Sequence, residues 1–390
     1  MNPTFRTSAS LRGLALCLAL LGGCGGGVGE GGTGSFASGP ITGFGSVIVN
    51  DVRFDDAAAS VQDGDGNSRT RDDLRLGMTV EVTSSAITSS STGAVASAKL
   101  IRYDSNLLGP VAAVDVAGSA FTVLGQRVAV DATTAFADTV GALSALKSGT
   151  LVEVFAVFDP ALARFRATRV GAASSGDVPH LLGQVSQLDG AAQTLRVGSS
   201  TYAFASAAGV PAGLANGQFV RMKMTAQPQA SGRFTVLSFG AALATVPDSD
   251  GASVKGLISS FTSSAAFSVG GRAIDASSAS FPNGSAGLAP GVRVEVQGSV
   301  RAGSFKASSV SIQSDDAEAS RNFELHGNIT AVNTALRTFV LRGLTVSTTR
   351  PDLRYQNGTA ANLVVGRSVE VKGVLSGDGL RIDAININFE

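Results

Sequence analysis

A short pattern recurs five times along this chain: a leucine, two residues, a glycine, two more residues, and then a strand of the type Val-Glu-Val. The copies span residues 74–82, 146–154, 214–222, 288–296 and 363–371. Their glycines, 68 to 75 residues apart, are Gly77, Gly149, Gly217, Gly291 and Gly366. A fixed period of this length indicates an array of similar small modules. We expect the five glycines to occupy turns whose backbone conformation other residues resist.

Each repeat reads as a β module. It opens on a glycine followed by alternating apolar residues, and it ends on a strand after the Val-Glu-Val segment. Turn residues recur at intervals of about 8–12, which is typical of small barrels and sandwiches. A sheet this small must close on itself to remove its edges. The sequence predicts an all-β chain, a tandem array of five small antiparallel barrels that are OB-fold-like, with a small β-sandwich of hairpins as the alternative.

The module boundaries follow from this plan and from composition. The predicted modules are 39–103, 107–171, 181–239, 254–313 and 324–390. Segments rich in Ser, Asp and Ala separate several of them, at 172–179, 240–253 and 314–322. We expect these linkers to be exposed and the modules to be weakly coupled, except where the short junction 103–106 holds the first two together.

The first residues predict export and a lipid anchor. Arg6 and Arg12 precede a short apolar run that ends at Gly23 and Cys24, so 1–23 reads as a lipoprotein signal peptide cleaved between Gly23 and Cys24. A glycine-rich tether follows Cys24 up to residue 38. The alternative is a free cysteine after an ordinary signal peptide. We expect lipid on Cys24 and attachment to a bacterial membrane, the outer membrane facing the periplasm or cell surface being favoured because Gly25 is not Asp.

The opening segment 39–50, the turn 63–67 and the repeated Leu-x-x-Gly-x-x-Val-Glu-Val motif resemble the bacterial domain of unknown function 5666 (DUF5666) family. The resemblance covers 38–389 in tandem copies and departs most at Arg221, where the third copy replaces the usual glutamate. The family typically follows a lipoprotein signal. It has no established activity, so the resemblance implies fold and location and no catalytic residues.

Composition narrows the partners. Lys plus Arg and Asp plus Glu both total 30, and the chain has no Trp and three Tyr. Neither the charge nor the aromatic content suits nucleic-acid binding. The predicted partners are the membrane, through the N-terminal lipid, and an envelope protein or polysaccharide.

Four copies of the motif place a glutamate between two valines: Glu81, Glu153, Glu295 and Glu370. Strand alternation turns each glutamate away from the valines, which predicts a solvated strand face. The third copy has Arg221 there, and a shared acid/base role would not permit that exchange.

The two histidines, His180 and His326, each precede the opening of a module. Neither has a cysteine or a second histidine nearby, whereas a zinc site of the Cys/His type needs several such ligands. We therefore expect both to be linker-end residues. The sequence predicts no cofactor, no metal and no catalytic residue.

A single stretch has the spacing of a cation loop. Asp63, Asp65 and Asn67 match the first ligands of a calcium loop, but Leu74 stands where a bidentate glutamate should close the shell. Asp-Gly and Gly-Asn pairs also suit a hairpin turn. A hairpin is the favoured interpretation, and a calcium turn is the alternative.

These observations favour a non-catalytic binding or scaffold protein of the cell envelope, since spaced modules on a tether suit contact at several points. Two alternatives stay open. One is a purely structural spacer. The other is an envelope enzyme whose site is dispersed between modules.

Overall fold

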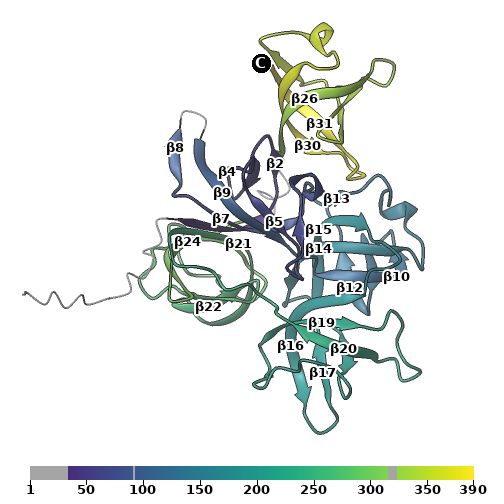
Figure 1. The fold of residues 1–390 in the computed structure, drawn as a ribbon, viewed down its shortest axis with the longest axis vertical. Helices are drawn as coiled ribbons and strands as arrows, with labels where there is room; N and C mark the ends of the chain where they lie inside the picture. The colour runs from purple at the N-terminus through teal and green to yellow at the C-terminus, as the bar shows by residue number, and fades with distance from the viewer. Residues whose placement is uncertain (1–33, 91–92, 315–322) are drawn as a thin grey trace, which may run out of the picture. The chain divides into compact units, whose positions relative to one another are not determined.

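The computed structural model describes residues 34–90, 93–314 and 323–390 (Figure 1). Within these ranges the chain is all-β and forms no α-helix, as predicted; three short 3-10 turns are η1 (Arg71–Asp73), η2 (Leu143–Ala145) and η3 (Ala360–Asn362). None of the described helices has the length and apolar character needed to cross a membrane. The predicted signal peptide, Gly23, Cys24 and most of the tether lie outside the described residues.

Residues 107–172 show how a barrel closes. The first strand pairs with the second, the second with the third, the third with the fifth, the fifth with the fourth, and the fourth with the first. This closed ring confirms the OB-fold-like prediction over the sandwich. The strands are β10 (Leu107–Asp115), β11 (Ala120–Val123), β12 (Gln126–Ala129), β14 (Leu151–Asp159) and β15 (Arg164–Ala172), with the short β13 (Ala135–Phe136) beside β15.

The prediction of purely antiparallel barrels needs a correction, because β12 and β15 run parallel. A ring of five strands cannot alternate direction all the way round. At least one neighbouring pair must therefore be parallel, and the long connection between β12 and β14 allows it.

The same circuit recurs in the next three stretches, each with its third and last strands parallel. Residues 180–240 contain β16 (His180–Asp189), β17 (Thr194–Val197), β18 (Ser200–Ala203), β19 (Phe219–Met224) and β20 (Phe234–Gly240). Residues 249–312 contain β21 (Ser249–Ser263), β22 (Ala266–Val269), β23 (Arg272–Asp275), β24 (Arg293–Arg301) and β25 (Ser304–Ile312). Residues 323–389 contain β26 (Phe323–Asn333), β27 (Thr338–Leu341), β28 (Leu344–Ser347), β29 (Arg354–Gln356), β30 (Ser368–Leu375) and β31 (Arg381–Phe389).

The first stretch, 35–103, varies the circuit by breaking its first strand at Ile41 and Thr42. Its strands are β1 (Ser35–Pro40), β2 (Gly43–Phe44), β3 (Val47–Val49), β4 (Val52–Asp55), β5 (Ser60–Gln62), β6 (Ser68–Arg69), β7 (Thr79–Ser84), β8 (Thr88–Ser90) and β9 (Gly93–Tyr103). We call the stretches 35–103, 107–172, 180–240, 249–312 and 323–389 barrels 1 to 5. The predicted module boundaries stay a prediction, because strand ends do not define folding units.

The barrels bury the apolar residues of the repeated motif. Residues on both sides of the middle position are 0–2% exposed in every copy: Val80 and Val82, Val152 and Val154, Val220 and Met222, Val294 and Val296, Val369 and Val371. Burying an aliphatic side chain of this size contributes about 1.5–3 kcal/mol. The motif therefore preserves the apolar residues that point into the barrel core.

Strands of different barrels pair with one another, which corrects the expectation of weakly coupled modules. Strand β1 pairs in parallel with β21, β2 pairs in parallel with β26, and β10 pairs with β16. One apolar core also runs through barrels 1 and 5, and another runs through barrels 2 and 3. Backbone hydrogen bonds and shared cores thus join barrels far apart in sequence.

The five repeat glycines have φ between +82° and +88°. In each copy the glycine amide donates a hydrogen bond to a backbone carbonyl of, or just after, the first strand of its barrel: Ile41, Val111, Val185, Ile258 and Ile329. A residue with a side chain is strained at this φ. At Gly77 a Cβ would also lie 2.3 Å from the carbonyl oxygen of Thr168 in barrel 2.

Candidate functional site

A polar cavity of about 570 Å³ lies where barrels 1, 2 and 3 meet. Acidic and basic side chains from all three barrels line it together. Buried charges are costly unless they are paired. The pairing within this wall therefore decides what the cavity can do.

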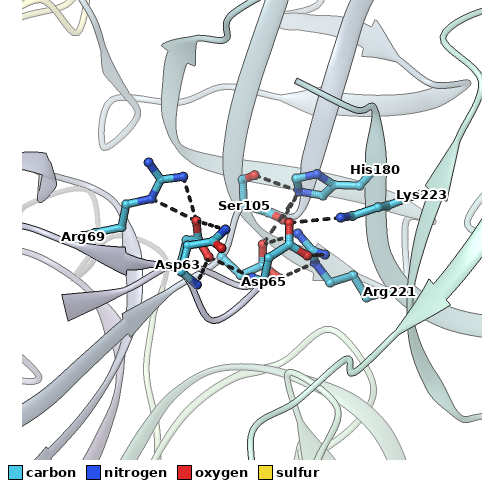
Figure 2. A network of polar contacts seen from close by, with 9 residues as sticks. Asp63, Asp65, Arg69, Ser105, His180, Arg221 and Lys223 are labelled. Carbon is cyan, nitrogen blue, oxygen red and sulfur yellow. Dashed lines mark hydrogen bonds and ion pairs between the residues drawn. The ribbon is translucent and has the colours of Figure 1, made fainter. Parts of the chain in front are cut away.

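Arg221 of β19 is the centre of that pairing, and its side chain is only 6% exposed. Its Nε lies 2.8 Å from Asp104 Oδ2, and its Nη1 lies 2.6 Å from Asp65 Oδ1. Figure 2 shows Arg221 and the neighbouring Lys223 both directed at Asp65, and Lys223 Nζ lies 3.1 Å from Asp65 Oδ2. Two cations of barrel 3 thus hold the 63–67 turn of barrel 1 and the 104–106 junction.

The turn presented to Arg221 is built by Asp63. Its carboxylate accepts hydrogen bonds from the amides of Asp65 and Asn67, from the Asn67 side chain and from Arg69. Strands β5 and β6 pair on either side, so the segment is a hairpin turn. Burial opposes ionisation of Asp63, but the bonds from Asn67 and Arg69 outweigh it and lower the pKa.

The same contacts weaken the calcium alternative. The oxygens of Asp63 already accept donors of their own turn, and both oxygens of Asp65 face the cations of barrel 3. The hydrogen bonds from Lys223 and Arg221 outweigh burial and lower the pKa of Asp65. A cation at this turn would have to displace two positive side chains.

Gly64 lets this turn approach the junction closely. A Cβ at Gly64 would lie 2.1 Å from Cγ of Asp104. The Asp104 carboxylate is itself held by Arg221 and cannot easily move aside. A glycine is therefore needed here for space, whatever its backbone conformation.

His180 corrects the linker-end interpretation, because it lies within β16 and is 6% exposed. Its Nε2 lies 3.0 Å from Ser105 Oγ and 3.7 Å from Asp104 Oδ1. Burial lowers the pKa of His180 in spite of the nearby Asp104 carboxylate. The Asp-Ser-His group is not a catalytic triad, since a triad places serine and aspartate on opposite ring nitrogens.

Two half-buried carboxyls complete the wall. Burial raises the pKa of Asp104 although Arg221 and His180 act against it. Burial also raises the pKa of Glu153, which shares a hydrogen bond with the Ser105 side chain. On the same wall, burial and the nearby Arg75 lower the pKa of Arg169 to about 10. Shifted groups beside one cavity mark a functional-site candidate.

The expectation that the repeated glutamates face solvent is wrong. All four are half-buried. Glu81 pairs with Arg272 of barrel 4 at 2.5 Å, and Glu153 lines the polar cavity. Glu295 accepts a hydrogen bond from the side chain of Gln297 on its own strand. Glu370 lies beside His326. Alternation correctly turns them away from their own cores, but neighbouring barrels or strands cover that outer face. His326 likewise lies within β26 and not in a linker.

Sequence reasoning missed Asp104, Ser105 and the partner of Arg221. The one available signal was Arg221 itself, which stands where four other copies have glutamate. Its hydrogen-bond partner Asp65 is 156 residues away in the chain. No local pattern carries that pairing.

Comparisons with known proteins identify the domain family. The family model described as "Domain of unknown function (DUF5666)" matches residues 109–171, 255–311 and 326–388, which confirms the resemblance. No curated protein matches the chain. A solved structure titled "drosophila Unr CSD456" is 14% identical, covering 55% of this chain and 98% of that one, with a TM-score of 0.14 that supports no inference.

Proposed function

Because three stretches of the chain match the DUF5666 domain in tandem, we propose that it is a non-catalytic binding or scaffold protein of the bacterial cell envelope. Its partners would be an envelope protein or polysaccharide. Lipid on Cys24 would attach it to the membrane, and the outer membrane is the favoured location. The segment before the barrels supports this anchor through its short apolar run, its small residues and its cysteine.

The observation that carries the binding role is the Arg221 network at the cavity. It joins residues of barrels 1 and 3 and of the junction through charge-assisted bonds of 2.6–3.1 Å. Such bonds hold a wall rigid, and a rigid polar wall binds with a smaller loss of conformational entropy. A simple spacer would have no need for a cavity lined by charged groups at this junction.

Arg75 offers a direct test. It lines the cavity, is exposed, and donates side-chain hydrogen bonds to backbone carbonyls of its own loop, so Arg75→Glu reverses one charge without breaking the Arg221 pairs. The experiment retrieves the lipidated full chain from solubilised envelopes after cross-linking and quantifies the captured partner. Arg233→Glu, an exposed change elsewhere on barrel 3, is the control.

We expect Arg75→Glu to reduce the captured partner about tenfold, as a loss of about 1.4 kcal/mol would, and Arg233→Glu to leave it unchanged. Equal capture by all three proteins would contradict a role for the cavity. No capture by the unaltered chain would favour the spacer alternative.

The cavity also supports the enzyme alternative, because Asp104 and Glu153 have raised pKa values and His180 has a lowered pKa. Shifted groups of this kind serve as general acids and bases. The test is hydrolysis of isolated envelope polysaccharide and peptide by the full chain, with Glu153→Gln as the comparison. Turnover that disappears in Glu153→Gln would replace the binding proposal with the enzyme.

A further inference from the structure

One outer face of barrel 5 gathers four charged or ligating side chains. In the antiparallel pair of β26 and β30, His326 is directly opposite Glu370, and Glu324 is directly opposite Lys372. Residues two apart on a strand point to the same side of the sheet. The register therefore places Glu324, His326, Glu370 and Lys372 on one surface (Figure 1, yellow strands β26 and β30).

The atoms that face each other have the spacing of metal ligands. His326 Nε2 lies 3.7 Å from Glu324 Oε1 and 3.7 Å from Glu370 Oε2. These distances are too long for hydrogen bonds. In a tetrahedral site with bonds of about 2.0–2.1 Å the ligand atoms are about 3.3 Å apart, so the two histidine–carboxylate separations exceed that spacing by only about 0.4 Å.

The other side of the imidazole is already fixed. His326 Nδ1 lies 3.0 Å from Glu390 Oε1, and the second oxygen of Glu390 accepts a bond from Ser368 Oγ at 2.8 Å. An ionised carboxylate can only accept, so Nδ1 carries a proton, and the Nε2 side of the ring faces Glu324 and Glu370. This carboxylate–histidine arrangement is the usual outer support of a metal-binding histidine.

Two neighbouring cations contact the carboxylates of this group. Lys372 Nζ lies 3.2 Å from Glu370 Oε1 and 3.7 Å from Glu324 Oε2, which are the oxygens turned away from the histidine. Arg53 of barrel 1 pairs with Glu324 Oε1. Three carboxylates against two cations leave a net negative charge beside the His326 ring. Within the described residues, Glu324, His326 and Glu370 are a group whose ligand atoms all lie within 4.8 Å of one another.

We propose that Glu324, His326 and Glu370 bind one divalent transition-metal cation, with Glu390 orienting the histidine. One imidazole and two carboxylates suit zinc-type ions better than calcium or magnesium, which take oxygen ligands alone. Three protein ligands would leave a position for water. Lys372 and Arg53 compete with the ion, so the affinity expected is micromolar.

The equivalent position of barrel 4 shows that the repeat alone does not create this group. There Lys255 stands opposite Glu295, and Ser253 stands opposite Gln297. The face carries no imidazole, and a lysine replaces the nitrogen ligand. Barrel 4 thus supplies a matched control within the same chain.

The test is isothermal titration of ZnCl₂ into the full chain at neutral pH, with Cys17→Ser and Cys24→Ser so that no thiolate competes. We expect one Zn²⁺ per chain. The affinity should fall at least tenfold in His326→Ala and in Glu370→Gln. It should be unchanged in His180→Ala, which removes the only other histidine, and in Glu295→Gln, which alters the matching position of barrel 4.

A second measurement needs no variant. The two histidines give two imidazole signals in an NMR spectrum, and Zn²⁺ should shift that of His326 while leaving that of His180 in place. No binding at 100 µM Zn²⁺, equal shifts of both signals, or full binding by a folded His326→Ala chain would overturn the proposal.

Discussion

Barrels 3 and 5 use the same face in opposite ways. In barrel 3, Leu182 is opposite Arg221 and His180 is opposite Lys223. In barrel 5, the matching pairs are His326 with Glu370 and Glu324 with Lys372. The first face is basic and receives the acidic turn and junction of barrel 1, whereas the second is acidic and receives Arg53 of barrel 1.

The comparison separates what the repeat preserves from what it leaves free. Inward residues are apolar in every copy because each barrel has to bury them. The outward middle position has no such constraint, so its charge follows the surface that covers it. We infer that the repeats share a core and differ by what each outer face contacts.

The largest effect is expected from Arg221→Gln, which removes the guanidinium of barrel 3 and leaves Asp104 without its strongest partner. Removing one member of a buried pair costs about 3–5 kcal/mol, and partial exposure of Asp104 places this change near 3. Chemical denaturation measures the loss. Glu295→Gln, at the same position in barrel 4, should cost less than about 1 kcal/mol. Equal losses for the two variants would show that the Arg221 pairs add no stability of their own.

A smaller effect is expected at the repeat glycines. Gly77→Ala strains a φ of +82° and also meets the Thr168 carbonyl, whereas Gly366→Ala strains a φ of +86° with open space around it. Strain of this kind costs about 1–3 kcal/mol. We expect a loss of about 1 kcal/mol for Gly366→Ala and clearly more for Gly77→Ala. Thermal melting of the two variants should rank them so, and the reverse order would show that barrels 1 and 2 do not pack at Gly77.

The smallest effect is a pH dependence. The lowered pKa values of Asp63 and Asp65 mean that their stabilisation is present above the unfolded pKa of about 4 and is lost as pH falls through the folded values. Melting temperatures between pH 7 and pH 2 should fall less steeply in Asp65→Asn than in the unaltered chain. Parallel curves would show that Asp65 gains nothing from Arg221 and Lys223.

The sequence predicted the local features well. Alternation identified the buried valines, the motif identified the positive-φ glycines, and Asp63 with Gly64 identified a turn. The same sequence could not reveal that the outward glutamates are half-buried, because the elements that cover Glu81 and Glu153 come from other parts of the chain. It also could not reveal the His326 group, because strand register brings Glu370 opposite it from 44 residues away.

Arg221 holds barrel 3 against the 63–67 turn of barrel 1, and a double-mutant cycle measures that coupling. The free energy of unfolding is measured for the unaltered chain, Arg221→Met, Asp65→Asn and the double variant, with Arg221 and Asp275, whose carboxylate pairs with Lys306 and Ser277, as the control pair. We predict a coupling of about 1–3 kcal/mol for Arg221 with Asp65 and none beyond about 0.5 kcal/mol for the control. Additive effects for Arg221 with Asp65 would contradict the claim.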